Sequence, residues 1–270
     1  MITVAALSDV HGNTPALRAV LAAVEREVPD VVVNLGDVAS GGVDPRGTLD
    51  LLRAHPEIVT VRGNHERQLL TVPPERMSRS DRYAHEQLDD DDRAWLRALP
   101  VRRELGAGVL AIHGTPADDL RYLLQTVDRG LREATDAEVL ERLGDEAGRW
   151  SLYLCGHTHL QRTRVLPDGS VVVNPGSVGW PAYDDDLPEP HVVEAGTPHA
   201  RFSVVRGGPG DWRVVEHAVE YDVEEAAALA ERNDRPDVVH ALRTGRVPVA
   251  ADGTAVSRSS SRSPRGSSRP

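Results

Sequence analysis

The chain has 270 residues, of which 40% are hydrophobic, and it carries a formal net charge of −11. That length and composition suit one large α/β domain or two small ones, and no apolar run approaches the roughly 20 residues that span a bilayer. The acidic balance and the absence of lysine disfavour a face for long nucleic acids, because such a face needs clustered basic side chains. We therefore expect a soluble globular protein without membrane partners.

The first residues, MITVAALSDVHGN, contain no basic segment and reach Ser8 and Asp9 after a short apolar run. This pattern predicts a buried first strand rather than a signal peptide. The single cysteine, Cys155, excludes an intrachain disulfide and fits a reducing cytoplasm. We expect a cytoplasmic protein in which Cys155 is a small packing residue.

Two runs of apolar and β-branched residues, 2–7 and 31–35, predict strands that are buried on both faces. Between them, apolar residues recur at helical spacing: Leu17, Val20, Leu21 and Val24. Thr14 is the predicted N-cap of that helix. A further helix at 48–55 and a strand at 58–61 complete a βαβαβ start with parallel strands.

A polar segment from about 66 to 100 is expected to be helical. Its four consecutive aspartates, at 89–92, could form a metal site or begin a helix. WLRAL follows them and Pro100 ends the segment, and carboxylates favour the positive N-terminal end of a helix dipole. We interpret the aspartates as a helix start.

The second half of the chain predicts strands at 109–112 and 151–155, hairpins at 162–174 and 207–211, and helices at 222–232 and 236–245. We place one domain at 1–247. The remaining residues, 248–270, are rich in Ser and Arg and are expected to form a disordered, dispensable tail. Such a tail could contact RNA or a membrane surface, although a solubilising role is the simpler interpretation.

Metal-ligating residue types follow the predicted strands. They are Asp9 and His11, Asp37, Asn64 with His65 and Glu66, His113, and finally His157 and His159. The carboxyl ends of strands line the ligand crevice in open α/β sheets, so these groups should meet in space.

The last pair lies in LYLCGHTH, residues 152–159. In an extended chain, side chains two residues apart point to the same side and lie about 7 Å apart, so both imidazoles could reach one small volume. Taken alone, the pair is more simply read as two solvated histidines on a turn. The ligand types at the other strand ends favour the metal interpretation.

Two carboxylates, one carboxamide and several imidazoles suit Mn²⁺, Fe²⁺, Co²⁺, Ni²⁺ or Zn²⁺. The ligands are too many for one ion. Two ions about 3.5–4 Å apart, with one bridging carboxylate, could clamp both the attacking and the leaving oxygen of a phosphoryl transfer.

These residues resemble the calcineurin-like metallophosphoesterase family, whose pattern is DxH, GD, GNH with an acid, H, and GHxH. Here the blocks read DVH at 9–11, GD at 36–37, GNHE at 63–66, His113 in IHGTP, and GHTH at 156–159. All five occur in family order. NPGSVG at 174–179 also resembles the small bacterial single-domain branch of YfcE-like predicted phosphodiesterases.

The resemblance implies a four-layer α/β/β/α sandwich of two mixed β-sheets, with two divalent metal ions, Mn²⁺ favoured. It implies one metal site of Asp9, His11 and His159 and another of Asn64, His113 and His157, with Asp37 bridging. It further implies that a metal-bridging hydroxide attacks phosphorus while His65 faces the leaving group. For Glu66, orienting His65 and lying solvated at the surface are both open.

Relatives that act on phosphoproteins or on symmetrical dinucleoside tetraphosphates carry an arginine soon after GD, in the pattern GDxVDRG. Residues 36–42 read GDVASGG here, without that arginine. Because a monoester dianion benefits from additional cations, we expect a small phosphodiester substrate. The alternatives are a phosphomonoesterase, including a protein serine/threonine phosphatase, and a non-catalytic interaction scaffold on the same fold.

Overall fold

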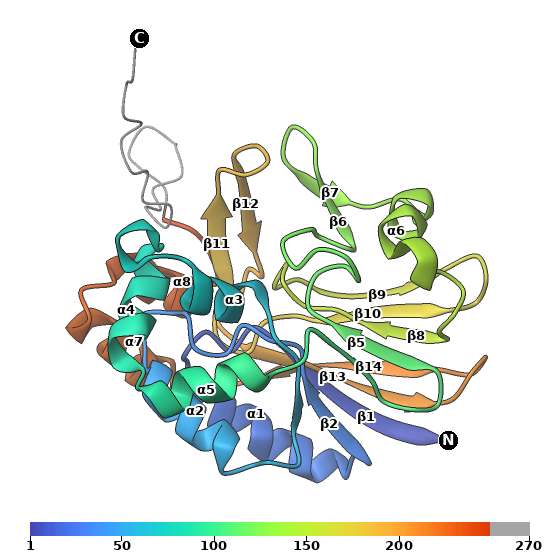
Figure 1. The fold of residues 1–270 in the computed structure, drawn as a ribbon, viewed down its shortest axis with the longest axis horizontal. Helices are drawn as coiled ribbons and strands as arrows, with labels where there is room; N and C mark the ends of the chain where they lie inside the picture. The colour runs from blue at the N-terminus through green and yellow to red at the C-terminus, as the bar shows by residue number, and fades with distance from the viewer. Residues whose placement is uncertain (249–270) are drawn as a thin grey trace.

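The structure is a computed structural model that describes residues 1–248, and two packed β-sheets form its centre (Figure 1). Helices cover the outer faces of both sheets. The tail expected at 248–270 lies outside the described residues, apart from its first residue. No helix of the described part is long and apolar enough to cross a membrane.

The first sheet has the strand order β14-β13-β1-β2-β3. Its strands are β1 (Ile2–Leu7), β2 (Val31–Asn34), β3 (Val59–Thr60), β13 (Ala200–Gly207) and β14 (Arg213–Val219). The pairs β1–β2 and β2–β3 are parallel, as the sequence predicts, and β13 adds antiparallel to β1.

The second sheet has the order β4-β5-β8-β10-β9. Its strands are β4 (Arg102–Glu104), β5 (Val109–Ile112), β8 (Leu152–Leu154), β9 (Gln161–Val165) and β10 (Val171–Pro175). The inner pairs β5–β8 and β8–β10 are parallel and the two edge strands are antiparallel, so both sheets are mixed.

Two hairpins stand apart from these sheets, at the end of the molecule where β5 and β8 finish (Figure 1). They are β6 (Gln125–Val127) with β7 (Leu131–Glu133), and β11 (Ala182–Asp185) with β12 (His191–Glu194). Strands β7 and β12 are in contact. Both hairpins were absent from the sequence prediction, because their acidic, polar sequences show no clear alternation.

Eight α-helices and two short 3₁₀ turns complete the described part. They are α1 (Thr14–Glu27), α2 (Pro45–Arg53), α3 (Asn64–Thr71), η1 (Pro74–Arg76), α4 (Arg79–Gln87), α5 (Asp90–Ala98), α6 (Asp136–Leu143), η2 (Gly144–Glu146), α7 (Val223–Arg232) and α8 (Pro236–Thr244).

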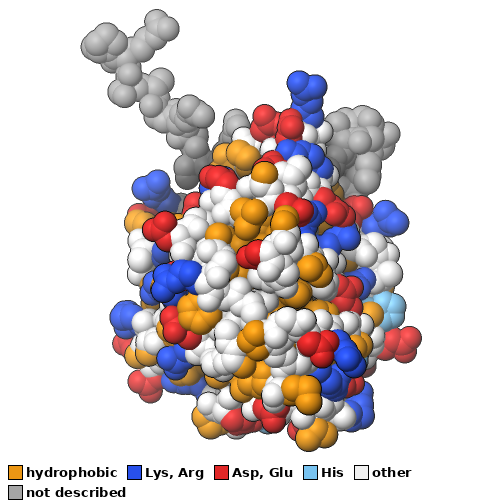
Figure 2. Space-filling model, turned by 90° about the vertical axis from the view of Figure 1, so that its right-hand side faces the viewer, with side chains coloured by type: hydrophobic (Ala, Val, Ile, Leu, Met, Phe, Trp, Pro, Cys, Tyr) orange, Lys and Arg blue, Asp and Glu red, His pale blue; other side chains and the backbone are white. Residues whose placement is uncertain are grey.

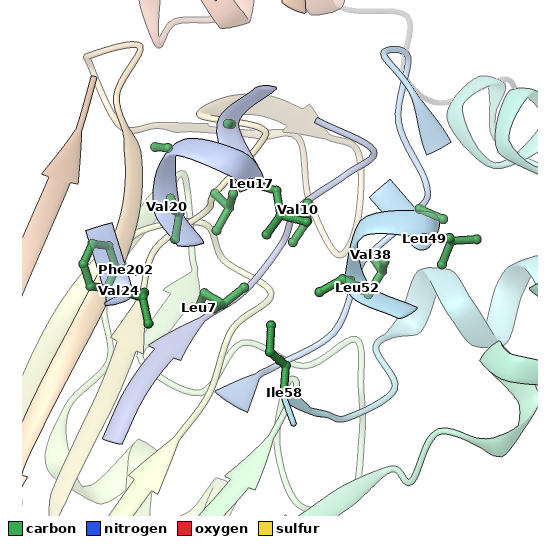
Figure 3. Packing of buried hydrophobic residues seen from close by; sticks show 14 of the residues in the cluster. Leu7, Val10, Leu17, Val20, Val24, Val38, Leu49, Leu52, Ile58 and Phe202 are labelled. Atoms are coloured by element: carbon green, nitrogen blue, oxygen red, sulfur yellow. The ribbon is translucent and has the colours of Figure 1, made fainter. Parts of the chain in front are cut away.

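Alternation along β1 divides the core into layers. Ala5 and Leu7 face α1 and α2 in one cluster (Figure 3), whereas Val4 and Ala6 face the second sheet. On the far side, Leu110 and Tyr153 pack with residues of α6 in a further cluster. The inner strands β5, β8 and β10 are buried on both faces. The order helix, sheet, sheet, helix confirms the predicted four-layer α/β/β/α sandwich.

The helix starts test two local predictions. Asp89 caps α5 and accepts a hydrogen bond from Asp92 N, while Asp92 accepts one from Asp89 N, so the aspartate run begins a helix as expected. The cap of α1 is Asn13 rather than the predicted Thr14, because the Asn13 side chain accepts from Ala16 N. Thr14 instead bonds Thr48 on α2.

Candidate metal centre

All seven predicted ligands lie at the carboxyl ends of strands, on loops of both sheets. They fall into two groups, Asp9 with His11 and His159, and Asp37 with His113 and His157, in which the ligand atoms lie within 4.8 Å of one another. Asn64 joins the second group through its Oδ1, 3.0 Å from His113 Nε2. The two sheets therefore contribute side chains to both groups.

In the first group, hydrogen bonds to the backbone decide which ring nitrogens are free. His11 Nδ1 donates to Ser40 O at 2.6 Å and His159 Nδ1 donates to Trp180 O at 2.7 Å. Both Nε2 atoms are then acceptors, yet they lie 3.0 Å apart. Asp9 Oδ1, 3.3 Å from His159 Nε2, has no hydrogen-bond partner among the described residues. Such converging acceptors repel one another unless a cation or proton lies between them.

In the second group, too, hydrogen bonds to the backbone fix the orientation of both imidazoles. His113 Nδ1 donates to Leu35 O at 2.8 Å and His157 Nε2 donates to Leu120 O at 3.0 Å. The opposite nitrogens face the side-chain amide of Asn64, at 3.0 Å for His113 Nε2 and 2.9 Å for His157 Nδ1. Asp37 Oδ2 lies 3.1 Å from His113 Nε2. Imidazole, carboxylate and carboxamide groups are ligands that borderline divalent ions accept, so the residues present fit the expected metal pair.

The backbone of these loops is left-handed at five of the seven ligands. The positive φ values are 55° at Asp9, 49° at His11, 55° at Asp37, 70° at His157 and 56° at His159. The sequence argument for GHTH assumed an extended chain, and that assumption is wrong. His157 and His159 reach different groups because each sits in a left-handed turn. Residues held in this conformation cost free energy and gather at functional sites.

Gly156 and Gly63 permit the loops to approach one another. A Cβ on Gly156 would lie 2.0 Å from Ser8 Oγ and 2.9 Å from Asp9 Oδ2. A Cβ on Gly63 would lie 2.2 Å from Asp37 Oδ1. Because glycine has no side chain, the carboxylates of Asp9 and Asp37 can lie in the space that a Cβ would fill.

Glu66 is fully buried and has a role that neither sequence interpretation foresaw. Its carboxylate accepts hydrogen bonds from the backbone amides of Asp37, Val38 and Gly63. It therefore ties the loop after β2 to the start of α3 rather than orienting His65 or meeting solvent. Burial raises the pKa of Glu66, and the nearby Asp37 adds to the rise.

The carboxylate that contacts His65 is Asp81 of α4, at 2.7 Å from His65 Nδ1. Asp81 is itself buried and accepts a hydrogen bond from Ser78 Oγ at 2.7 Å. Burial lowers the pKa of His65, but Asp81 and Asp37 outweigh it and raise that pKa to about 10. Asp81 lies outside the five motifs, so nothing in the sequence pattern indicated it.

In the metal-free chain, burial and neighbouring charges shift the pKa values of these side chains in different directions. Burial would raise the pKa of Asp9, but the neighbouring His159 lowers it to about 2. Burial lowers the pKa of His11 to about 3, so this imidazole is neutral and ready to coordinate. For His113, burial favours the neutral form, but Asp37 outweighs it and raises the pKa to about 9.

Two tyrosines pack over the GHTH histidines. The ring centroid of Tyr122 lies 5.1 Å from that of His157, and the centroid of Tyr183 lies 4.7 Å from that of His159. The hydroxyl groups are 2.7 Å apart, and Tyr122 Oη also contacts His191 Nε2 at 2.9 Å. His191 is buried in this network.

Residues 2–161 match the calcineurin-like phosphoesterase family. The match spans more than half of the chain, so the chain belongs to this family, and the resemblance drawn from the five motifs is confirmed. By class it is a metal-dependent phosphoric ester hydrolase, and its two ligand groups agree with the divalent ions that the family uses. No curated protein sequence matches the chain.

Solved structures align with most of the chain, and the first two named below share its fold. A metallophosphoesterase from Sphaerobacter thermophilus is 24% identical with a TM-score of 0.69, over 90% of this chain and 100% of that one. A hypothetical protein from Pyrococcus horikoshii OT3 is 19% identical with a TM-score of 0.70, over 91% of this chain and 99% of that one. Yfce, a phosphoesterase from E. coli, is 16% identical with a TM-score of 0.40, over 81% and 100%.

Proposed function

We propose that the protein hydrolyses small phosphodiesters with two divalent metal ions. The observation that carries this proposal is the convergence of metal-ligating side chains in two adjacent groups, the first of which brings acceptor atoms together without donors. In the first group, the Nε2 atoms of His11 and His159 face each other at 3.0 Å. Buried acceptors that lack donors are costly, and cations remove that cost.

One ion would be held by Asp9, His11 and His159, and the other by Asn64, His113 and His157, with Asp37 between them. Asp37 Oδ1 accepts from His65 N at 2.9 Å, which fixes the carboxylate while Oδ2 faces the second group. Oxygen and imidazole donors without a thiolate admit Mn²⁺, Fe²⁺, Co²⁺, Ni²⁺ or Zn²⁺, and we favour Mn²⁺.

When bound, two such ions lower the pKa of coordinated water and neutralise the phosphoryl oxygens. His65 supplies the remaining function, donation of a proton or hydrogen bond to the departing oxygen. Its partner Asp81 keeps the ring oriented and charged, since this carboxylate raises the pKa of His65 to about 10 despite burial. A group that is protonated at neutral pH suits the role of general acid.

The preference for diesters rests on the cations at the pocket. Besides histidines, Arg121 and Arg142 are the basic residues that line it in the described part of the chain. Arg142 donates to Leu123 O and Gln125 O, and Arg121 pairs with Glu141. A monoester dianion would therefore find little additional positive charge, whereas a diester monoanion needs less.

The surface gives no support to a long polyanionic substrate. On the side that Figure 2 shows, arginine side chains alternate with acidic ones across the described residues, and hydrophobic groups lie between them. Association with a nucleic acid requires a continuous basic surface. We therefore propose a small phosphoester substrate.

Turnover of bis(p-nitrophenyl) phosphate and p-nitrophenyl phosphate, measured side by side with Mn²⁺, Ni²⁺, Zn²⁺ and chelator, tests the proposal. We expect metal-dependent turnover with the diester preferred. A preference for the monoester would favour the phosphatase alternative. Absence of turnover with every metal would instead leave the interaction scaffold.

A further inference from the structure

The metal centre opens into a cavity much larger than a phosphate group requires. Its volume is about 750 Å³, and His65, His157 and His159 form one end of its wall. The wall continues along the two hairpins, through Val127 of β6 and Leu187 beyond β11. Pockets that enclose an organic ligand of drug size measure roughly 300–1,000 Å³. A substituent of considerable size can therefore fit beside the phosphorus.

Aromatic and apolar groups form much of this wall. Trp180, Tyr122 and Tyr183 line it, as do Leu120 and Pro188. The tyrosines are held in place, because their hydroxyl groups bond each other at 2.7 Å and Tyr122 also contacts the buried His191. Rigid aromatic surfaces bind flat or ring-shaped groups with little loss of side-chain entropy.

Several polar groups of the wall accept hydrogen bonds, and its two arginines, Arg121 and Arg142, are already paired with Glu141 and with backbone oxygens. Gln125 is 3% exposed, and its Oε1 has no hydrogen-bond partner among the described residues. Carboxylates of Asp118, Asp184 and Asp185 also line the cavity, and they accept hydrogen bonds but disfavour a second phosphate. Amine or hydroxyl groups on an uncharged ligand would complement this surface.

We propose that the cavity is the subsite for one organic substituent of the phosphodiester, and that this substituent is a bulky, uncharged, ring-containing alcohol of nucleoside size. This proposal rests on the proposed phosphodiesterase activity and names the substrate class of that activity. A protein side chain would leave most of the cavity unfilled, and a polyphosphate would place anions against its carboxylates.

The test compares two diesters that release the same p-nitrophenolate, namely methyl p-nitrophenyl phosphate and thymidine 5′-(p-nitrophenyl phosphate), on the Mn²⁺-loaded full chain. We expect kcat/KM to be about 10-fold or more higher for the thymidine ester. Equal values for the two esters would overturn the subsite. Failure of both esters and of bis(p-nitrophenyl) phosphate would overturn the proposed function itself, and the subsite with it.

A substitution that fills the cavity provides a second test of the proposal. Val127→Trp should lower the ratio of the two kcat/KM values about 10-fold, because the indole occupies the space of the nucleoside. The matched control is Val165→Trp on β9, outside the cavity wall and 65% exposed, which should leave the ratio unchanged. An unchanged ratio in a folded Val127→Trp variant would contradict the proposal.

Product inhibition tests the same subsite without any variant. Thymidine 5′-monophosphate should inhibit turnover of bis(p-nitrophenyl) phosphate at a concentration about 10-fold or more lower than inorganic phosphate does, since the nucleoside adds contacts in the cavity. Deoxyribose 5-phosphate should fall between them. If all three inhibit equally, only the phosphate is recognised and the subsite does not exist.

Discussion

Among the proposed metal ligands, His113 holds a proton in the metal-free chain near neutral pH. Its pKa is raised to about 9 by Asp37, although burial opposes this. Coordination through Nε2 requires the neutral imidazole, so binding of Mn²⁺ at about pH 7 should release about one proton from this residue and should weaken as the pH falls.

Calorimetric titration with Mn²⁺ in two buffers of different ionisation enthalpy counts the released protons. His113→Ala should release fewer protons than the wild type. The same number from both proteins would place the titrating group elsewhere.

Replacement of His65 should separate metal binding from catalysis. His65→Ala removes the proposed donor but none of the seven proposed ligands, so both metals should remain by elemental analysis. Turnover should fall roughly 10²- to 10⁴-fold, with the larger loss for alkyl leaving groups that need protonation. Loss of a metal would make His65 a ligand, and an unchanged rate on an alkyl ester would remove its catalytic role.

Asp81 should control the pH at which His65 acts. This carboxylate raises the pKa of His65 above its usual value, and an acid is active only below its own pKa. Asp81→Asn should therefore move the alkaline limb of the kcat profile to lower pH. The control is Asp90→Asn, fully exposed on α5, whose limb should not move. A limb that stays in place in the Asp81 variant would show that the contact is only structural.

At the scale of elements, Asn13 joins α1 to two other parts of the chain. Its side chain accepts from Ala16 N and donates to Gly179 O and Tyr221 Oη. Asn13→Ala removes the helix cap and leaves a buried carbonyl without its donor, so we expect a loss of about 2–3 kcal/mol in the free energy of unfolding by urea.

The control for this helix is Arg18→Ala. Arg18 pairs with Glu225 at the surface, where both side chains are about half exposed, and such pairs contribute roughly 0–1 kcal/mol. Equal losses in the free energy of unfolding for Asn13→Ala and Arg18→Ala would mean that the cap contributes no more to stability than a surface ion pair.

An element could be predicted when the burial of its residues leaves a pattern in the sequence. The inner strands of the two sheets were predictable, because burial on both faces leaves nearly continuous apolar runs such as VVV in β2 and VLAI in β5. The edge strand β4 was not predicted, because its sequence, RRE, is polar and largely exposed. The hairpin β11–β12 was also missed, because its AYDD and HVVE segments are short and its buried polar residue, His191, is satisfied by Tyr122 from a distant segment. Contacts between distant elements leave no periodic signal.

The same distinction applies to the metal centre. That the proposed ligands lie close together was predictable, because each follows a strand within one of the five motifs. The Asp81 contact with His65 was not, since α4 reaches the site only through the packing of α3 against α4. The left-handed turn at His157 was also missed, because histidine rarely adopts a positive φ and no glycine stands at that position.

For the whole molecule, each ligand group joins the two sheets. Asp9 and His11 follow a strand of the first sheet, and His159 follows a strand of the second. Ions that bind only the folded chain should stabilise it by about 4 kcal/mol per site at a concentration of 1,000 times Kd. Tm should therefore rise with Mn²⁺ and fall with chelator in differential scanning calorimetry. Equal Tm values in the presence of Mn²⁺ and in the presence of chelator would contradict the two metal sites.

The left-handed backbone at Asp9, His11, Asp37, His157 and His159 also shapes what selection for heat resistance would do to this chain. Each position costs about 1–2 kcal/mol in the left-handed region for an ordinary side chain, and glycine avoids most of that cost. A library selected for thermal resistance with chelator present should accumulate glycine at these positions and lose activity, whereas a library selected with Mn²⁺ should retain the ligands. Deep sequencing of both pools would show this divergence, in which a metal-free protein becomes more stable by losing its proposed metal ligands.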